Sequence, residues 1–240
     1  MRASVITVAA AKGGVGKTTL AYELAAALGG TLVDLDWDSG GATRMWGYDP
    51  SKHSRSPLLD AFEAGPEARA PRPKTAPRRP ALVPAHPDLA ASRIPDDLVA
   101  DSLLAWAGEW GKGHIVVDTH PGANPLTDGA MQAADLVVVP VILAAREMDA
   151  LEGMLADYAA YRLLLVPNMV PGIPPRRFVE RLTKDAAGTR VAPPISEHRW
   201  LRRRLRRAAV TLELNPGARL KAAAEEFRRV AAEVEATLGS

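Results

Sequence analysis

Short apolar runs alternate with longer stretches of helical composition along the whole chain. Several of the runs are rich in Val and Ile and show no polar alternation, which is typical of parallel strands buried on both faces. The predicted strands are 4–10, 31–35, 81–83, 115–117, 136–141 and 163–166, and the predicted helices are 18–28, 96–110, 147–161 and 218–238. This alternation predicts an α/β fold in which a doubly wound, mostly parallel sheet is flanked by helices.

The length of the chain favours one globular domain, 1–240, because 240 residues with 47% hydrophobic content can build a full core. A division into two domains is the alternative that length alone leaves open. The segment 65–80 is rich in Pro and in basic residues. We expect it to be an exposed connection with extended conformation, and a solvated loop without a function is the simpler interpretation.

A glycine-rich loop follows the first predicted strand and leads into the first predicted helix. It reads AKGGVGKTT over residues 11–19. Glycines let successive backbone N–H groups point at a phosphate, and the helix N-terminus adds partial positive charge. Lys17 would reach the β- and γ-phosphates, and the Thr18 hydroxyl would ligate Mg²⁺. The motif predicts a P-loop for a nucleoside triphosphate, formed by Gly13, Gly14, Val15, Gly16, Lys17, Thr18 and Thr19.

The cysteine content and the lengths of the apolar runs exclude several classes of protein. The chain has no Cys, which excludes disulfides, thiolate zinc sites, iron–sulfur clusters and cysteine nucleophiles. No apolar run approaches the roughly 18 residues of a membrane span. We therefore expect a cytoplasmic protein that is neither secreted nor embedded in a membrane. The net charge is only +2, but the basic residues are concentrated in a few segments, which matters more for partners.

A second lysine stands at the head of the glycine-rich loop. With Lys12, the motif KGGVGKTT resembles the deviant Walker A signature of the ParA/MinD family of P-loop ATPases, and the chain is most similar to the Soj-like ParA proteins that partition DNA. The resemblance implies ATP as the nucleotide and a nucleotide-sandwich homodimer. In that dimer Lys12 would touch the phosphates of the other copy and stabilise transition-state charge, as an arginine finger does.

The segment LVDLDWDSGG after the second predicted strand resembles the family's switch I, usually D-x-D-P-Q. Asp34 and Asp36 match its two acids, and the resemblance makes Asp36 the residue that positions the attacking water. Asp34 could instead be only a turn former at the strand end. Trp37 and Asp38 stand where the family has Pro and Gln, which leaves the geometry of the switch and the rate of hydrolysis open.

A second acidic strand end occurs in HIVVDTHPG, which resembles the family's Walker B and switch II segment. An apolar strand that ends in Asp118 would deliver a carboxylate beside the metal, where it can hold a Mg²⁺-bound water. His120 occupies a position where Pro is more usual, and we assign it no chemistry. Farther along, Asn168 in LLLVPNMV matches a residue that contacts adenine in the family.

The segment RWLRRRLRRAAVTL, residues 199–212, contains no acidic residue. At helical spacing its apolar side chains form one stripe, which predicts a docked helix with an exposed basic face. The stripe would be Leu201, Leu205, Ala208 and Leu212, and the basic face would be Arg199, Arg202, Arg203, Arg206 and Arg207. Such a face gives sequence-independent DNA affinity, and the resemblance implies nonspecific DNA binding in this part of the chain. A merely solvated face and a membrane-surface helix are the alternatives.

These observations lead to one favoured function and several competitors. The favoured function is a ParA-like ATPase for plasmid or chromosome segregation, associated with the nucleoid, whose DNA-bound dimer is released when a ParB-like centromere-binding protein stimulates hydrolysis. The alternative is a MinD-like regulator of a membrane or cell-division complex, against which the acidic C-terminal stretch argues. The absence of Cys excludes the iron–sulfur reductases of the superfamily, no ligase motif is evident, and the last Tyr, Tyr161, lies too early for a tyrosine kinase cluster.

Overall fold

A single parallel sheet forms the centre of the computed structural model, which describes residues 1–38, 41–53, 56–186, 188–204 and 207–240. Within these residues the strand order is β3-β2-β4-β1-β5-β6-β7, and every pairing between neighbouring strands is parallel. The strands are β1 Ser4–Val8, β2 Thr31–Asp34, β3 Ala81–Val83, β4 His114–Asp118, β5 Leu136–Val141, β6 Leu163–Pro167 and β7 Arg190–Val191. The doubly wound α/β prediction is confirmed.

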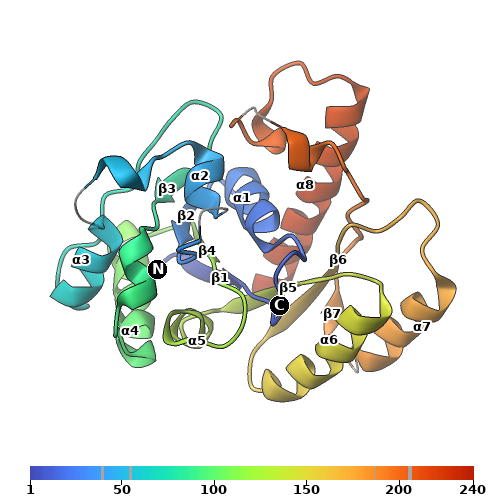
Figure 1. Cartoon of the computed structure of the whole chain (residues 1–240), viewed down its shortest axis with the longest axis horizontal. Helices are drawn as coiled ribbons and strands as arrows, with labels where there is room; N and C mark the ends of the chain where they lie inside the picture. Colours follow the sequence, from blue (N-terminus) through green and yellow to red (C-terminus); the bar gives the residue numbers. More distant parts are fainter. Residues whose placement is uncertain (39–40, 54–55, 187, 205–206) are drawn as a thin grey trace.

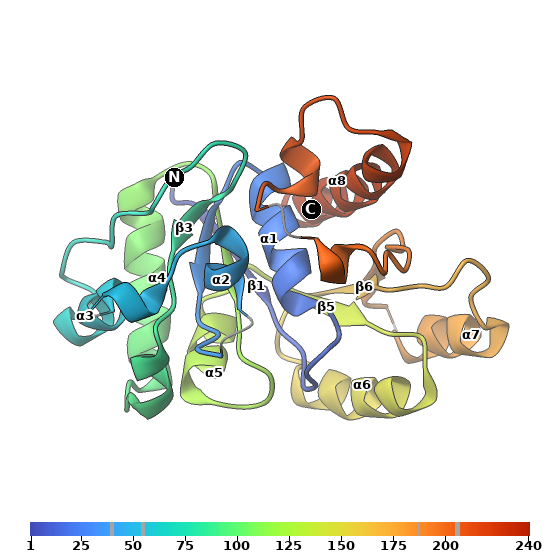
Figure 2. The ribbon, with the colours of Figure 1, turned by 45° about the horizontal axis from the view of Figure 1, so that its top comes forward.

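Helices cover both faces of this sheet (Figure 1). They are α1 Lys17–Ala27, α2 Ala42–Trp46, α3 Pro57–Ala64, α4 Asp96–Trp110, α5 Pro125–Gln132, α6 Ala145–Asp157, α7 Arg176–Asp185 and α8 Ala218–Leu238. Helices α1, α2 and α8 pack on one face, and α3, α4, α5, α6 and α7 pack on the other. Figure 2 shows α1 and α8 together on their side of the sheet.

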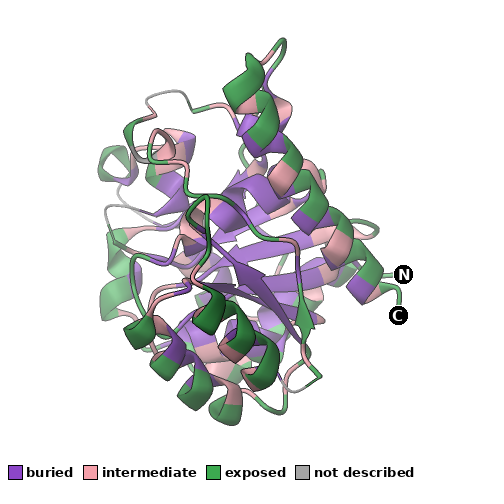
Figure 3. Ribbon diagram, turned by 90° about the vertical axis from the view of Figure 1, so that its right-hand side faces the viewer, coloured by how far each residue is buried: buried purple, intermediate pink, exposed green. Residues whose placement is uncertain are grey.

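The core divides by the alternation of side chains along each strand. On β1, Ile6 and Val8 face α1 and α8, whereas Val5 faces α4. Both sets of side chains are buried, which is why the strands read as continuous apolar runs rather than alternating ones. Figure 3 shows the strands buried between helices whose outer faces are exposed.

The long helices and the strands match the sequence expectations to within a few residues. Helix α4 begins at Asp96 as predicted. Helix α6 begins at Ala145, two residues earlier than expected, and ends at Asp157, four residues earlier than expected. Four helices, α2, α3, α5 and α7, and the short edge strand β7 were not predicted. Two of these helices carry ordinary start signals: the side chains of Ser56 and Asn124 cap α3 and α5, and a Pro follows each cap.

The Pro-rich segment 65–80 is irregular, as expected, but it is attached to the body of the protein at several points. The Lys74 and Leu82 backbones exchange two hydrogen bonds of 2.7 and 2.9 Å, and the Ala70 N–H donates to Glu109 Oε2 at 2.7 Å. Near its end, the Arg78 carbonyl accepts from the Ala209 N–H at 2.8 Å. The segment therefore lies against the arginine-rich part of the chain.

The prediction of a helix in the arginine-rich segment 199–212 is wrong. The segment instead contains two single 3₁₀ turns, Leu201–Arg203 and Val210–Leu212, and Arg204 between them has an extended backbone. Contacts from elsewhere in the chain satisfy the backbone groups that a helix would pair internally. The Tyr22 hydroxyl donates to the Arg207 carbonyl at 2.6 Å, and Glu23 accepts from the N–H groups of Val210 and Thr211 at 2.8 and 3.1 Å.

Within the described part of the chain, no helix is both long and apolar enough to cross a membrane.

Candidate nucleotide-binding site

Three neighbouring strands bring the predicted site together at their carboxyl ends. β1 leads into the glycine-rich loop, and β2 and β4 lie next to one another in the sheet. In the parallel register Asp34 is opposite Asp118 and Val8 is also opposite Asp118. Because ligands of open α/β sheets bind outside the carboxyl ends of the strands, the register places two acidic strand ends and the loop at one site.

The glycine-rich loop has the backbone shape that phosphate binding requires. Gly14 and Gly16 have positive φ values of 78° and 91°, which other residues adopt only with strain. At Gly16 any side chain would also collide with the Asn168 amide. Helix α1 begins immediately afterwards, at Lys17, so its N-terminal N–H groups are available to an anion.

Lys17 is buried, with 5% of its surface exposed. Its Nζ donates to the Lys12 carbonyl at 3.3 Å. Burial lowers the pKa of Lys17, and the nearby Asp118 and Asp36 carboxylates oppose this effect. The side chain is thus a cation held inside the loop, where it can exchange one weak carbonyl contact for phosphate oxygens.

Asp118, like Asp34, is fully buried. Neither of its carboxylate oxygens has a hydrogen-bond partner among the described residues. Burial, followed by the charges of Asp34 and Asp36, raises its pKa well above the ordinary value, although the Thr18 hydroxyl and Lys17 counteract this. A buried carboxylate with no hydrogen-bond partner in the described part of the chain, close to a threonine hydroxyl, fits Mg²⁺, which prefers oxygen ligands and retains several waters. Thr18 and Asp118 are therefore suited to hold the ion, directly and through water.

The two acids of switch I, Asp34 and Asp36, differ in their hydrogen bonds and in their burial. Asp34 is fully buried, and its oxygens accept the N–H groups of Asp36 at 3.0 Å and Thr43 at 2.6 Å. Burial raises its pKa to about 7 despite these bonds. Asp34 therefore fixes the loop to the start of α2. Asp36 is 9% exposed, and its carboxylate accepts the Asp38 N–H at 3.1 Å.

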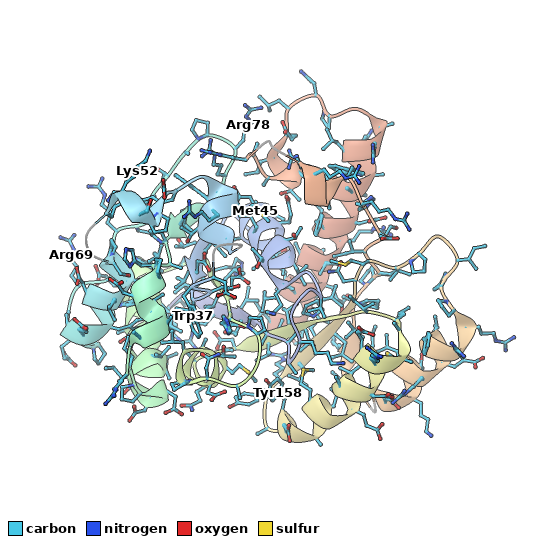
Figure 4. The ribbon with its side chains drawn as sticks, in the orientation of Figure 1. Trp37, Met45, Lys52, Arg69, Arg78 and Tyr158 are labelled. Atoms are coloured by element: carbon cyan, nitrogen blue, oxygen red, sulfur yellow. The ribbon has the colours of Figure 1, made fainter. Side chains whose placement is uncertain are left out.

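The unusual residues of the two switches contact one another. Trp37, labelled in Figure 4, stacks on the His120 ring with centroids 4.0 Å apart and an angle of 7° between the planes. Asp38 Oδ2 lies 3.4 Å from His120 Nε2. Sequence reasoning noted that these residues depart from the family pattern but missed the contact between them. The contact follows from the parallel pairing of Asp34 with Asp118, which brings the following residues together and which the sequence alone does not specify.

The comparisons with known proteins agree with this geometry. Residues 3–163 match the family model AAA_31, described as an AAA domain. The chromosome-partitioning ATPase Soj of Thermus thermophilus is 32% identical over 176 residues, which cover 70% of this chain and 68% of Soj. The chain belongs to the ParA/MinD family of P-loop ATPases.

Solved structures of ParA/MinD proteins share the whole fold. McdA of Cyanothece, determined as a complex with ATP, has a TM-score of 0.76 at 17% identity, covering 99% of this chain and 97% of McdA. The MinD cell division protein of Aquifex aeolicus has a TM-score of 0.73 at 18% identity, covering 98% and 97%. At these identities the likeness shows the fold alone, so it does not distinguish a partitioning role from a cell-division role.

Lys12, the lysine that marks the ParA/MinD loop, is exposed. Its Nζ donates to the Arg146 carbonyl at the start of α6, at 2.8 Å. One backbone carbonyl is a weak anchor for a solvated lysine. The side chain therefore remains accessible to phosphates presented from outside the chain.

Asn168 lies at the end of β6 and is 6% exposed. Its amide donates to the Val15 carbonyl in the phosphate loop, at 2.8 Å. A cavity of about 380 Å³ opens beside it, lined by Thr19, Leu20, Arg44, Met45, Asn168, Met169, Ile195, Ser196, Glu197, His198, Arg199, Leu201, Arg204 and Phe227. Its position next to the loop suits the base and sugar of a nucleotide in a ParA/MinD ATPase.

In the described part of the chain, the arginines predicted to contact DNA do not lie along one helix. Arg203 and Arg207 are exposed, and Arg207 Nη1 donates to the Gly47 carbonyl at 3.3 Å. Arg199 lines the cavity beside Asn168 and pairs with Glu197 at 3.2 Å. Arg206 and the side chain of Arg202 lie outside the described part of the chain, as does Leu205 of the predicted apolar stripe.

Arg204, which sequence reasoning omitted, is largely buried. Its guanidinium donates to Glu213 Oε1 at 2.5 Å and to the Ala208 carbonyl at 2.7 Å. Glu213 also pairs with Arg78 at 3.3 Å, and Figure 4 shows Arg78 on the side of the molecule where α8 begins. Arg204 thus holds the segment together rather than facing a partner.

Proposed function

We propose that the protein is a ParA-like ATPase for plasmid or chromosome segregation, formed by one domain, 1–240. ATP and Mg²⁺ would close a homodimer, and the dimer would bind double-stranded DNA without sequence preference. Hydrolysis to ADP and phosphate, stimulated by a ParB-like centromere-binding partner, would release it. Such a protein acts in the cytoplasm, on the nucleoid.

One observation carries this proposal. A buried Lys17 lies near two buried acids, Asp118 at the end of β4 and Asp36 in the loop after β2, while Lys12 remains exposed at the mouth of the phosphate loop. The first arrangement suits a nucleotide and a metal ion within one chain. The second suits a cation supplied to the nucleotide of another copy.

The site residues divide the proposed reaction among themselves. Bound Mg²⁺ supplies Lewis-acid stabilisation of the phosphate charge, and Thr18 and Asp118 would hold it. Lys17 would move from the Lys12 carbonyl to the β- and γ-phosphates. Asp36, whose pKa burial raises, would accept a hydrogen bond from the attacking water and orient it toward the γ-phosphorus.

DNA binding would use the exposed arginines around the 3₁₀ turns rather than a helical face. Within the described part of the chain, no acid pairs with Arg203 or Arg207, whereas Arg78 and Arg204 both pair with Glu213. Exposed arginines neutralise phosphates and release counterions, so their contribution is independent of sequence. The basic segment 65–80 lies alongside and adds to the same positive field.

The MinD-like alternative would require a surface for a membrane. The C-terminal helix α8 buries its apolar face, including Phe227, Val230 and Val234, against the sheet and α1. That face cannot enter a lipid surface without leaving the core. DNA is therefore the favoured partner.

The test compares Lys12→Ala with wild type. The variant should bind ATP with affinity within a few-fold of wild type, because the Lys12 ammonium donates to the Arg146 carbonyl in its own chain. It should fail to dimerise with ATP and Mg²⁺ in light scattering, and should lose hydrolysis. Asp36→Ala should keep ATP and accumulate as dimer. A wild type that stays monomeric with ATP and Mg²⁺, or a Lys12→Ala variant with normal turnover, would contradict the proposal.

A further inference from the structure

Three potential metal ligands meet where switch I contacts switch II. Asp36, Asp38 and His120 each offer one ligand atom, and the three atoms all lie within 4.8 Å of one another. The first is buried, the second exposed and the third half-buried, so the group lies at the mouth of the site and not inside it. Neither carboxylate is used by the Thr18 and Asp118 pair that suits Mg²⁺.

The His120 ring is oriented as metal-binding histidines are. Its Nδ1 lies 2.9 Å from the Pro121 carbonyl, which can only accept, so Nδ1 carries a proton. In the neutral ring this leaves the lone pair of Nε2 directed at the Asp38 carboxylate, 3.4 Å away. Two acceptors cannot face one another unless a cation lies between them or Nε2 is also protonated. A backbone carbonyl that fixes the other nitrogen is the usual support of a ligating imidazole.

The two carboxylates are also held in place. Asp36 Oδ1 accepts the Asp38 N–H at 3.1 Å, which ties the two residues together, and Trp37 between them stacks on the imidazole. Metal ligands at about 2.0–2.2 Å from an ion lie at most about 4.4 Å apart. An inward movement of the exposed Asp38 side chain would close the set around one ion.

The surroundings favour a cation and leave room for it. A cavity of about 270 Å³ adjoins the cluster, and its lining includes Asp36, Asp38 and Arg44. The guanidinium that lines this cavity, Arg44, already pairs with Asp49 at 3.2 Å. Lys17 is another cation acting on Asp36, and it is shared with Asp118.

We propose that Asp36, Asp38 and His120 bind a first-row divalent transition metal of the Zn²⁺ class, apart from the Mg²⁺ of the nucleotide. One imidazole and two carboxylates form a mixed nitrogen and oxygen set that suits Zn²⁺ or Co²⁺ and is a poor match for Mg²⁺. The adjoining cavity leaves space for water to complete the coordination.

The bound ion would be inhibitory. It would take the Asp36 carboxylate, which the proposed mechanism assigns to the attacking water, and would fasten switch I to switch II. This consequence rests on the proposed ATPase function, whereas binding of the ion does not. Binding is therefore measured first, on protein without nucleotide.

The binding experiment titrates tag-free, nucleotide-free protein with Co²⁺ and follows visible absorption, then displaces Co²⁺ with Zn²⁺. Wild type should bind one ion per chain. Affinity should fall at least roughly tenfold in His120→Gln and in Asp38→Asn. The control is His114→Gln, because His114 also faces a carboxylate, Glu235 at 3.9 Å, but at the opposite end of β4; it should bind as wild type does. Circular dichroism confirms that each variant is folded.

Three results would overturn the proposal. The first is absence of Co²⁺ binding to wild type at about 1 mM. The second is unchanged affinity in His120→Gln. The third is loss of binding in Thr18→Ala, which would assign the ion to the phosphate loop.

The activity experiment then adds Zn²⁺ to the ATPase assay at constant Mg²⁺. Zn²⁺ should inhibit wild type and His114→Gln over the concentration range in which it displaces Co²⁺. The turnover of each variant is normalised to its own value without Zn²⁺. His120→Gln should need a Zn²⁺ concentration at least tenfold higher for the same fractional inhibition. Equal inhibition of both histidine variants would contradict the regulatory role while leaving the binding result to stand by itself. A wild type without ATPase activity but with the Co²⁺ site would instead contradict the proposed function.

Discussion

The phosphate loop and the arginine-rich segment 199–212 both contact helix α1, but different forces shape them. The loop takes its course chiefly from its own glycines and from the helix that it starts, and one distant side chain, Asn168, donates to its Val15 carbonyl. The segment is held by side chains from distant parts of the sequence. Tyr22 and Glu23 hold its backbone from α1, and Arg78, in the Pro-rich segment, pairs with Glu213 directly after it.

The two regions should therefore respond differently to amino-acid substitutions. A locally determined loop should keep its shape when a functional side chain is removed, so mutations there act on binding and catalysis. A segment whose backbone is fixed by two or three distant side chains should lose its shape when one of them is removed. Substitutions in both regions test this contrast, from the largest expected effect to the smallest.

Lys17→Ala should weaken ATP binding by roughly 100-fold or more, about 2.7 kcal/mol, because it removes the buried cation that faces the phosphates. Calorimetry with ATP and Mg²⁺ measures this, with exposed Lys112→Ala as the control. Amide exchange at Val210 and Thr211 should be unchanged, since the arginine-rich segment does not depend on Lys17. Unaltered ATP affinity would refute the loop assignment.

Glu23→Ala should lower the free energy of unfolding by about 2–4 kcal/mol, because it leaves the buried N–H groups of Val210 and Thr211 without an acceptor. Urea denaturation gives the stability, and hydrogen exchange at Val210 and Thr211 should accelerate. Exposed Glu225→Ala is the control. Unchanged exchange at these two amides would mean that the segment holds its own shape, and the contrast would fail.

Asp118→Asn should stabilise the nucleotide-free protein above neutral pH, by about 1–2 kcal/mol or roughly 2–8 °C in Tm. Burial and the charges of Asp34 and Asp36 raise the pKa of Asp118 in the folded state. The folded state therefore binds more protons than the unfolded one, and stability is present below about pH 4 and is lost as pH rises through the folded pKa.

Thermal melts from pH 4.5 to 8 measure this dependence, with exposed Asp101→Asn as the control. The gain from Asp118→Asn should shrink toward acid pH, where the wild-type carboxyl is protonated. A gain that is the same at every pH would show that repulsion among the acids is not its cause.

Replacing Arg203 and Arg207 by Ala should have the smallest effect, a few-fold decrease in DNA affinity. The slope of log affinity against log salt should fall by about one unit for each phosphate that an arginine no longer neutralises, and all duplex sequences should be weakened alike. Fluorescence anisotropy over a salt series, with ATP and with ADP, measures it. Arg93→Ala, exposed on another part of the surface, is the control. If the double variant binds DNA as wild type does, these arginines are only solvent-exposed and make no contact with DNA.

Most of what sequence reasoning predicted correctly was determined locally. The glycine spacing, the apolar runs and the strand-end acids are each set by residues close together in the sequence. The arginine-rich helix was predicted from the same kind of local periodicity and was wrong, because Glu23 lies far away in sequence and supplies the competing hydrogen bonds. The Trp37 contact with His120 was missed for a related reason, since it depends on which strands are neighbours.

Helix α1 connects the two regions. Its first residues form the end of the phosphate loop. Tyr22 and Glu23, one turn farther along the helix, bind the backbone of the arginine-rich segment directly. A displacement of α1 when the γ-phosphate leaves would reach Arg207 and Val210 directly, since the side chains of Tyr22 and Glu23 join them to the helix by hydrogen bonds. In a ParA-like cycle, loss of the γ-phosphate would then be the event that triggers the release of DNA.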